Sequence, residues 1–332
     1  MPHRRSSPAT GSRQRCSPAA LSRQRSSGDL LADRRYAYAE ACLAEGDARA
    51  ACEMAEQALD LAPRFAPAWF LLGRARERLG ATPDLRQAAL RAYENALDLD
   101  PDDALGARLR LARIGGADGA PAITPAYVRA LFDGYAARFD RHLVGALGYR
   151  GPAMLVDALD GACGGRAAFA EALDLGCGTG LVGTALGERI GRLAGCDLSP
   201  AMLALARGTG RYARLVEADL AAFLAGEPAA SADLVAAADV LIYVRDLAPV
   251  LAGIARVMRP GALAAFTVQS PPDGETAADG VLGEDGRYAH ADAAVAARAG
   301  AAGLAVALLR PAAVRRENGR DVPGRVVLLR TA

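Results

Sequence analysis

Three glycines at alternate positions, Gly176, Gly178 and Gly180, follow the acidic residue Asp174 in the stretch LDLGCGTG. Glycine lacks a Cβ atom, so its backbone adopts positive φ angles easily and another group can lie directly against the main chain. The glycines come after an apolar segment, where a strand is expected to turn into a helix. We therefore predict a small-molecule site here, although a tight turn without a ligand would also use glycine.

A second acid, Asp197, ends the next apolar segment and follows Gly176 by 21 residues. In a βαβ unit that binds a nucleotide, an acid at about this distance accepts hydrogen bonds from the ribose diol. The glycines alternate as G-x-G-x-G, whereas dinucleotide sites use G-x-G-x-x-G and hold a pyrophosphate at the helix N-terminus. We therefore expect a ligand that contains a nucleoside but is not bound through a phosphate cradle.

The stretches DLGCGTG and GCDLSPAML resemble the first two motifs of class I S-adenosylmethionine-dependent methyltransferases. The resemblance implies that the glycine turn passes under the methionine part of the cofactor. It also implies that Asp174 orders this turn and that Asp197 holds both ribose hydroxyls. S-adenosyl-L-methionine is therefore the expected cofactor.

Further matches to this family follow in the expected order over residues 170–270. They are residues 215–220, whose Asp219 would face the adenine amino group, and the stretches 233–244 and 257–263. The resemblance implies an α/β fold with a Rossmann-like sheet of seven strands and an antiparallel edge. The cofactor-binding residues that it implies are Asp174, Gly176, Cys177, Gly178, Gly180, Asp197, Leu198, Met202, Asp219, Leu220, Tyr135 and Arg138.

A group of aromatic and charged residues precedes the core, in the segment 125–143. It resembles the helical lid of several small-molecule methyltransferases. The resemblance implies that Tyr135 and Arg138 contact the methionine carboxylate and that Phe139 covers the sulfonium. An amphipathic helix that packs Phe132, Tyr135 and Phe139 on the core would show the same spacing, and both interpretations can hold together.

Methyl transfer from a sulfonium requires alignment and exclusion of water rather than a nucleophile on the enzyme. A hydroxyl, carboxyl or amine acceptor could still need a group that removes or stabilises its proton. Position at a strand end favours Asp239 and Tyr243, because open α/β sheets bind ligands beyond the carboxyl ends of their strands. The other candidates are His142, Tyr288 and His290, and Arg315, Arg316 and Arg320 would meet an acidic substrate unless they form a solvated turn.

Composition argues for a soluble, cytoplasmic protein that binds neither nucleic acid nor membranes. The chain has 332 residues, 52% hydrophobic residues and a net charge of +1, so no global field attracts a polyanion. No apolar run reaches the roughly 18 residues of a membrane span. The six cysteines include no C-x-x-C pair and the three histidines are scattered, so we expect no metal site. We expect a small-molecule or carrier-bound methyl acceptor.

The region before the catalytic core divides into three segments by composition. Residues 1–34 are rich in Ser, Arg and Pro and are predicted to form a disordered tail. Residues 35–115 resemble an all-α tetratricopeptide-like domain, since Trp69, Leu72 and Gly73 fit the W-x-x-L-G signature. Residues 116–124 read as a linker, which leaves residues 125–332 for the methyltransferase domain and 168–332 for its core.

The repeats, the lid and the core together resemble a bacterial group of predicted tetratricopeptide-containing methyltransferases. Helical repeats of this kind often bind a protein partner, so a partner is a further expectation. Two other functions remain open at this point. The chain could be a repeat scaffold whose nucleoside-binding domain is catalytically inactive, or, less consistent with the glycine pattern, a nicotinamide oxidoreductase.

Overall fold

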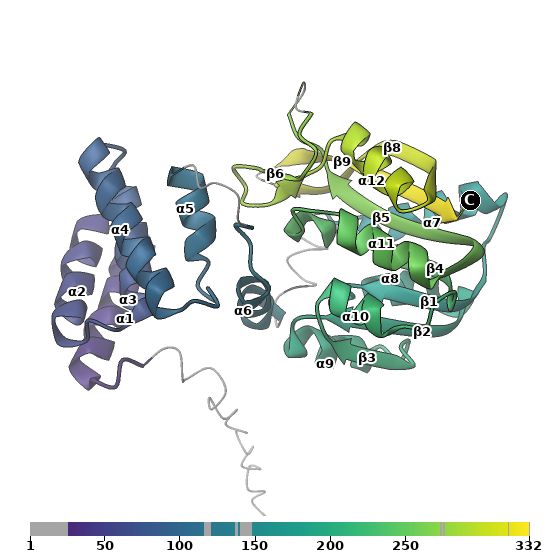
Figure 1. Ribbon diagram of the computed structural model, residues 1–332. Coiled ribbons are helices and arrows are strands. Elements are labelled where there is room, and N and C mark those ends of the chain that lie inside the picture. Colours follow the sequence, from purple (N-terminus) through teal and green to yellow (C-terminus); the bar gives the residue numbers. More distant parts are fainter. Residues whose placement is uncertain are drawn as a thin grey trace, which may run out of the picture. The chain divides into compact units, whose positions relative to one another are not determined.

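The computed structural model describes residues 26–115, 121–136, 139, 148–272, 274, 276–317 and 319–331 (Figure 1). The chain divides into two compact units, Met1–Leu99 and Asp100–Ala332. Most of the predicted tail, the first part of the predicted linker, and the site candidates Arg138 and His142 lie outside the described residues.

The first unit consists of helices that pack as antiparallel neighbours through small side chains. Alanines occupy most of its core, among them Ala39, Ala51, Ala58 and Ala68, and these let the helix backbones approach closely. The helices are α1 (Leu30–Glu45), α2 (Ala48–Leu61), α3 (Ala66–Leu79) and α4 (Pro83–Leu99). An N-terminal helical region is therefore present, as predicted.

Helix α1 begins inside the range that the sequence assigned to the tail. Asp29 explains the earlier start, because its side chain accepts hydrogen bonds from the backbone N–H groups of Leu31 and Ala32. This N-cap satisfies two donors that a helix terminus otherwise leaves unpaired. Gly46, at φ 93°, ends the same helix in the left-handed region.

The second unit is built on one mixed sheet, which contains nine strands in the described part of the chain. Seven of them follow the order β3-β2-β1-β4-β5-β9-β8, with β1 to β5 parallel to one another and β9 antiparallel to β5. These strands are β1 (Phe169–Leu175), β2 (Ile190–Asp197), β3 (Arg214–Glu217), β4 (Ala232–Ala237), β5 (Met258–Gln269), β8 (Leu304–Glu317) and β9 (Arg320–Thr331).

The predicted count of seven strands is therefore not confirmed. Two additional strands, β6 (Val281–Leu282) and β7 (Tyr288–Ala289), pair with each other, and β7 also pairs with the end of β5. Strands of two residues have no alternating pattern that a sequence could display. The mostly parallel α/β architecture itself agrees with the prediction.

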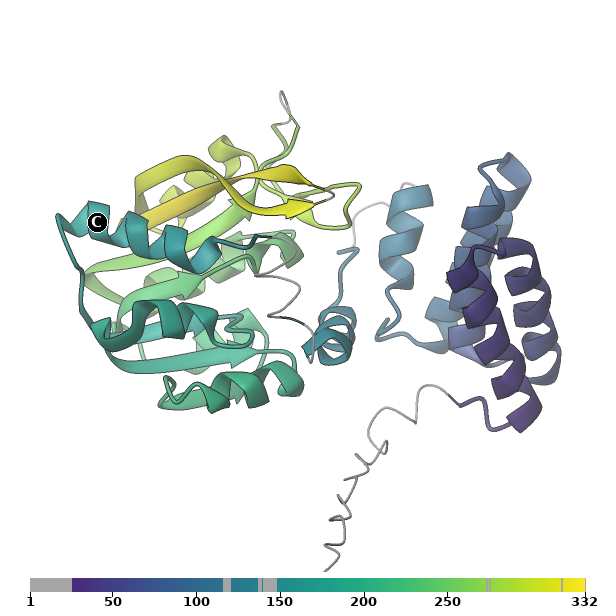
Figure 2. The same ribbon diagram turned by 180° about the vertical axis from the view of Figure 1, so that it is seen from behind.

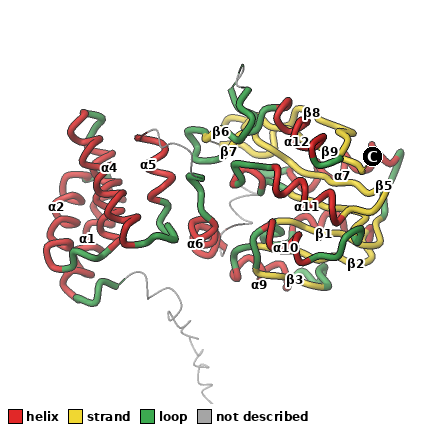
Figure 3. Tube along the Cα trace, viewed as in Figure 1, coloured by secondary structure: helices red, strands yellow, loops and turns green. Residues whose placement is uncertain are grey.

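Helices cover both faces of this sheet, as the two opposite views in Figures 1 and 2 show and the tube in Figure 3 summarises. Successive residues of a strand point to opposite faces. In β4, Val235 and Ala237 therefore pack with one layer of helices, and Leu234 and Ala236 pack with the other. The first layer is α10 (Leu220–Gly226), α11 (Ala248–Val257) and α12 (Asp292–Ala301), and the second is α7 (Gly151–Cys163) and α8 (Leu181–Leu186).

Helices α5 (Ala107–Gly115) and α6 (Pro125–Tyr135) come before α7 in the second unit. The sequence assigned the first of them to the repeats, but the structure groups it with the second unit. Its Leu109 packs in a cluster with Ile123 and Tyr288, residues that are far apart in the sequence. Within the described ranges, no helix combines the length and the apolar character needed to cross a membrane.

Candidate functional site

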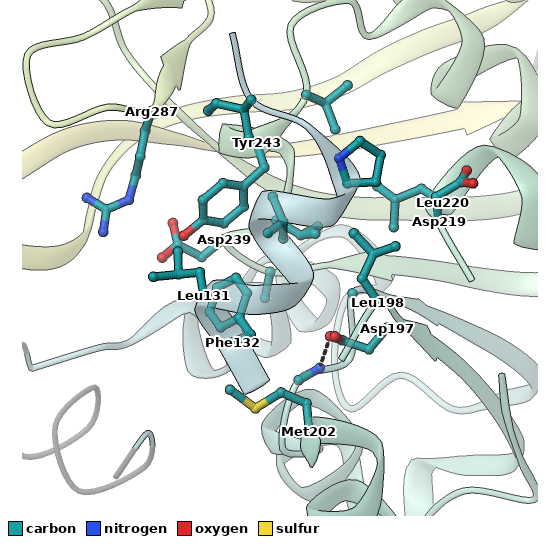
Figure 4. A pocket seen from close by; sticks show the side chains of 18 of the residues that line it. Leu131, Phe132, Asp197, Leu198, Met202, Asp219, Leu220, Asp239, Tyr243 and Arg287 are labelled. Carbon is teal, nitrogen blue, oxygen red and sulfur yellow. Dashed lines mark hydrogen bonds between the residues drawn. The ribbon is translucent and has the colours of Figure 1, made fainter. Parts of the chain in front are cut away.

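A cavity of about 830 Å³ lies at the carboxyl ends of β1, β2 and β4, beneath helix α6. Cavities that hold a drug-sized ligand span roughly 300 to 1,000 Å³. Figure 4 shows Asp197, Leu198 and Met202 on one side of this cavity, and Asp239, Tyr243 and Arg287 on the other. We refer to these two sides as the glycine-turn end and the arginine end.

The glycine turn lies between β1 and α8, with Gly176 at φ 64°, Gly178 at φ 54° and Gly180 at φ 90°. All three angles are in the left-handed region that favours glycine. A Cβ atom on Gly176 would come within 2.3 Å of Val240 Cγ2, whereas a Cβ on Gly178 would meet no protein atom within 4 Å. Gly176 is therefore required for packing, while Gly178 leaves its backbone open to the cavity.

Asp197 borders the cavity at the end of β2, beside the glycine turn (Figure 4). Its Oδ2 accepts from the backbone N–H of Gly178 at 2.9 Å, and its Oδ1 accepts from that of Ser199 at 2.9 Å. Burial raises the pKa of this carboxyl, and these backbone donors offset part of the effect. Each carboxylate oxygen carries further acceptor capacity, so the group can bind a diol while it holds the turn.

The remaining predicted residues of this end lie along the cavity wall. Leu198, Met202 and Leu220 all line it, and Met202 projects from helix α9 (Pro200–Gly208). Asp219 also lines it and caps α10, because its Oδ1 accepts from the backbone N–H of Ala222 at 2.9 Å. Asp219 therefore caps α10 and borders the cavity at the same time.

Asp174, Cys177 and Gly180 are not among the described residues that line the cavity. Asp174 is fully buried behind the turn, and its Oδ2 accepts from the hydroxyl of Tyr212 at 2.6 Å. Its Oδ1 has no hydrogen-bond partner among the described residues, and burial raises the pKa of this carboxyl to about 7. Cys177 packs against Leu203, and burial raises the pKa of its thiol.

Helix α6 supplies the described part of the predicted lid. Thr124 caps it and Pro125 occupies its first turn, so the helix begins where the sequence predicted. Phe132 and Tyr135 line the cavity together with Phe139, and the Phe139 ring lies 5.9 Å from that of Phe132 and 5.4 Å from that of Tyr135. The aromatic side chains of this segment therefore face the cavity.

A hydrogen bond that the sequence did not predict ties α6 to the glycine-turn end. Asp133 Oδ1 accepts from the hydroxyl of Ser199 at 2.6 Å, and Ser199 also caps α9. A second link is the ion pair of Arg129 with Glu217 at 2.8 Å, both about half exposed. The Ser199-Pro200 pair indicated a helix start, but no local pattern indicated that the Ser199 hydroxyl would bond to Asp133 on α6.

Asp239 follows β4 and adopts φ 58°, which is rare for a residue other than glycine. Its Oδ1 accepts from Arg315 Nη1 at 2.6 Å. Burial raises the pKa of Asp239, and the guanidinium of Arg315 partly offsets this. Its cavity position agrees with the location that the sequence indicated.

Arg315 corrects the sequence interpretation of a solvated arginine turn. Its side chain is 3% exposed and lines the cavity, because β8 continues to Glu317 and turns this residue inward. By contrast, Arg316 is exposed and pairs with Asp321 at 3.1 Å, and Arg320 is exposed too. Adjacent residues of a strand point to opposite sides, which explains the different environments of Arg315 and Arg316.

Tyr243 lines the cavity together with Arg287, a residue that the sequence did not suggest. Burial raises the pKa of this phenol. Arg287 Nη1 also contacts Asp285 Oδ2 at 3.4 Å and pairs with Glu317. Arg287 lies just before β7, and strand pairing brings it to Tyr243.

The weaker proton-transfer candidates have structural roles. The hydroxyl of Tyr288 accepts from the backbone N–H of Ala122 at 2.8 Å, and His290 Nε2 lies 3.3 Å from the carbonyl oxygen of Leu241. Both side chains are buried, and neither is among the described residues of the cavity wall. Burial also lowers the pKa of His290, which keeps it neutral.

Residues 173–266 match the family described as methyltransferase domain. This part of the chain is therefore a methyltransferase domain. Methyltransferase-like protein 27 of Homo sapiens is 39% identical over 105 residues, which are 31% of this chain and 42% of that protein. The chain therefore matches less than half the length of this curated relative.

Solved structures of methyltransferases are similar to this domain over about half of the chain. The N-methyltransferase NodS from Bradyrhizobium japonicum WM9, in complex with S-adenosyl-L-homocysteine, is 18% identical, with a TM-score of 0.43 over 54% of this chain and 85% of that one. An S-adenosylmethionine-dependent methyltransferase from Mesorhizobium loti is 20% identical, with a TM-score of 0.39 over 49% and 91%. Both scores are low, so the methyltransferase assignment rests on the family match.

Proposed function

We propose that this protein transfers the methyl group of S-adenosyl-L-methionine to a small-molecule or carrier-bound acceptor. The observation that supports this most directly is the pair formed by Gly178 and Asp197. An exposed stretch of glycine backbone and a diol acceptor border the same cavity, and within the described part of the chain no atom lies within 4 Å of the position of a Cβ on Gly178.

The residues of the glycine-turn end fit this cofactor. Gly178 leaves room for a ligand against the main chain, Asp197 offers acceptors for two ribose hydroxyls, and Leu198 and Met202 offer apolar contacts to a base. Asp219 would accept from the adenine amino group. Asp174 and Tyr212 would act indirectly, by holding the turn from behind.

The bound cofactor would supply a methyl group that is already activated by the positive charge on its sulfur. The side chains of this domain would then align the acceptor and exclude water. Leu131 and Phe132 of α6 close the cavity on one side. The Tyr243 ring packs edge-on against the Phe132 ring, with the ring centroids 5.6 Å apart. Asp239 and Tyr243 are the groups of the arginine end that could hold or accept an acceptor proton.

We also propose that the protein is a cytoplasmic enzyme and that α1 to α4 form tetratricopeptide-like repeats. These repeats would bind a protein partner. Trp69, Leu72 and Gly73 lie on α3, where the repeat signature would have them. The indole Nε1 of Trp69 donates to the carbonyl of Pro63 at 2.8 Å, which fixes the turn between α2 and α3. Helix α1 packs against α2, and α3 packs against α4, as the two helices of a helical repeat do, and this packing supports the proposal.

Calorimetric titration of the full chain with S-adenosyl-L-homocysteine tests the proposed cofactor. We expect binding, and we expect Asp197→Ala to weaken it about 5- to 150-fold, since bonds to a charged group contribute roughly 1 to 3 kcal/mol. Asp157→Asn, at an exposed position on α7, is the control and should bind like the parent protein. Unchanged affinity in Asp197→Ala would refute the assignment.

A nicotinamide cofactor provides a second arm of the same experiment. NADH should show no binding at concentrations that saturate the protein with S-adenosyl-L-homocysteine. Binding of S-adenosyl-L-homocysteine without methyl transfer to any acceptor in a metabolite extract would favour the catalytically inactive scaffold instead.

A further inference from the structure

We infer that the arginine end of the cavity binds the amino group of the methyl acceptor, so that the acceptor is an amine on an apolar body rather than a carboxylic acid. This inference rests on the proposed function and adds the substrate class. Three independent observations carry it: the charge balance of the cavity wall, the prior engagement of its arginines, and its aromatic surface.

Carboxylates outnumber cations among the described residues that line the cavity. The five acids are Asp197, Asp219, Asp239, Asp246 and Asp279, and the three cations are Arg245, Arg287 and Arg315. The proposed cofactor itself contributes a sulfonium charge. A wall with an excess of negative charge stabilises a second cation close to that sulfonium, whereas an acceptor carboxylate would add to the excess of negative charge.

All three nitrogens of Arg315 already have acceptors within the protein. Nη1 donates to Asp239 at 2.6 Å, Nη2 to Gln269 at 2.8 Å, and Nε to Glu317 at 3.2 Å. Nη2 also lies 3.7 Å from Asp285 Oδ2. A carboxylate substrate that replaced Asp239 or Glu317 on the guanidinium would leave a partly buried charge without its partner, which is unfavourable.

Arg287 is engaged in the same network. Its Nη1 contacts Asp285 and pairs with Glu317. Together, Arg287 and Arg315 carry two positive charges and face three carboxylates, Asp239, Asp285 and Glu317. The network therefore has one carboxylate more than it needs to balance its arginines.

Aromatic rings line the cavity next to this network. Phe132 contacts Tyr243 edge-on, with ring centroids 5.6 Å apart and an interplanar angle of 89°. Tyr135 and Phe139 extend the same surface. Aromatic faces attract ammonium groups, and they would also bind the apolar body of the acceptor.

An amine must give up a proton before it can be methylated, because its lone pair forms the new bond. Asp239 is the carboxylate of the network that lines the cavity, so the proton would pass from the ammonium nitrogen to a carboxylate oxygen of Asp239. Burial favours the protonated form of this residue.

The test uses three probes with the same apolar body: 2-phenylethylamine, 3-phenylpropionate and 3-phenylpropan-1-ol. The full chain is first titrated with S-adenosyl-L-homocysteine. If this compound does not bind, the result counts against the proposed function and is distinguished from a failure of the inference about the acceptor. Each probe is then titrated calorimetrically into the saturated protein. We expect the amine to bind at least tenfold more tightly than either the carboxylate or the alcohol.

Asp239→Asn removes the negative charge at the same place and keeps a side chain of similar size. It removes the carboxylate that Arg315 Nη1 contacts, so the preference for the amine over the carboxylate should fall at least tenfold. Asp157→Asn, exposed on α7, should retain the parent preference. The comparison of the three probes on the parent protein remains decisive if Asp239→Asn does not fold.

Three results would overturn the inference. These are equal or tighter binding of 3-phenylpropionate, equal or tighter binding of the alcohol, and no detectable binding of the amine to protein saturated with S-adenosyl-L-homocysteine. A parent-like preference in folded Asp239→Asn would also contradict it, because the recognition would then not depend on this carboxylate.

Discussion

The backbone N–H of Gly178 donates to Asp197 Oδ2 at 2.9 Å and so joins the turn after β1 to the end of β2 (Figure 4). Asp197 thus has two roles, since the oxygen that holds the turn belongs to the group proposed to bind the ribose. The turn and the acid are therefore expected to respond together to substitution.

Alanine substitutions at Gly176 and Gly178 should have different effects. Either change places a side chain at positive φ, which costs roughly 1 to 2 kcal/mol. Gly176→Ala also overlaps Val240 and should lose about 1 to 3 kcal/mol more, because overpacking is destabilising. Gly178→Ala should remain folded and lose at least tenfold in affinity for S-adenosyl-L-homocysteine. Urea unfolding and calorimetry measure the two quantities, and the reverse ranking would contradict this prediction.

The hydrogen bond between Asp133 and Ser199 should slow the release of bound cofactor product. Loss of this bond in Asp133→Ala frees α6 from α9, and we expect S-adenosyl-L-homocysteine to dissociate roughly 3- to 10-fold faster, as for one hydrogen bond. Stopped-flow displacement measures the rate. Arg129→Ala breaks partly exposed ion pairs with Glu217 and Asp133 but keeps the bond from Ser199 to Asp133, and it should change the rate less than about twofold. Equal rates in the two variants would exclude this role for Asp133.

Asp174 should make the protein less stable as pH rises from about 4 to 7. Burial raises the pKa of its carboxyl from 3.8 to about 7, so the folded state favours the protonated form. The stability that it contributes is fully present below pH 3.8 and is lost as pH rises through 7, on the order of 4 kcal/mol in total.

Asp174→Asn removes this titration and keeps an acceptor for Tyr212. Thermal melting at pH 5, 6, 7 and 8 should therefore show a smaller decrease of Tm in Asp174→Asn than in the parent protein. Asp157→Asn, on the exposed side of α7, should follow the parent curve. Parallel curves for the parent and Asp174→Asn would show that Asp174 does not titrate in this range.

Arg315 and Arg316 are adjacent, yet their substitution should have very different effects on stability. Arg315→Met leaves Asp239 and Glu317 without their buried partner and should destabilise the protein by about 3 to 5 kcal/mol. Arg316→Met removes an exposed pair with Asp321 and should change stability by less than about 1 kcal/mol.

A double variant provides a further check on this network. Adding Asp239→Asn to Arg315→Met removes one of the unpaired carboxylates, so part of the lost stability should return. Urea unfolding of both single variants and the double variant gives the coupling between the residues. Additive effects would mean that the two side chains do not interact in solution.

The local features of the site followed from sequence patterns. These features are the turn at Gly176 and Gly178 and the strand end at Asp197. Both depend on residues that are close in the chain, so the residue types indicate the local backbone geometry. The mostly parallel α/β sheet followed from the order of the motifs. The start of α6 at Pro125 agrees with the start of the predicted lid segment 125–143.

The positions of the two arginines at the arginine end did not follow from sequence patterns, although those of Asp239 and Tyr243 did. Arg287 and Arg315 come from segments near β7 and on β8, and only strand pairing brings them to Asp239 and Tyr243 at the end of β4. The sequence could not decide whether Arg315 or Arg316 faces inward, because a shift of one residue in register exchanges the two faces of a strand.

The amino-acid sequence by itself determined the methyltransferase motifs, the class of fold and the presence of helices before the core, because these depend on local spacing. Only the tertiary structure decided which charges face one another in the cavity. Asp133 meets Ser199, and Arg315 meets Asp239, across 66 and 76 residues of chain. Contacts over such separations depend on how the strands and helices pack, and no local pattern specifies them.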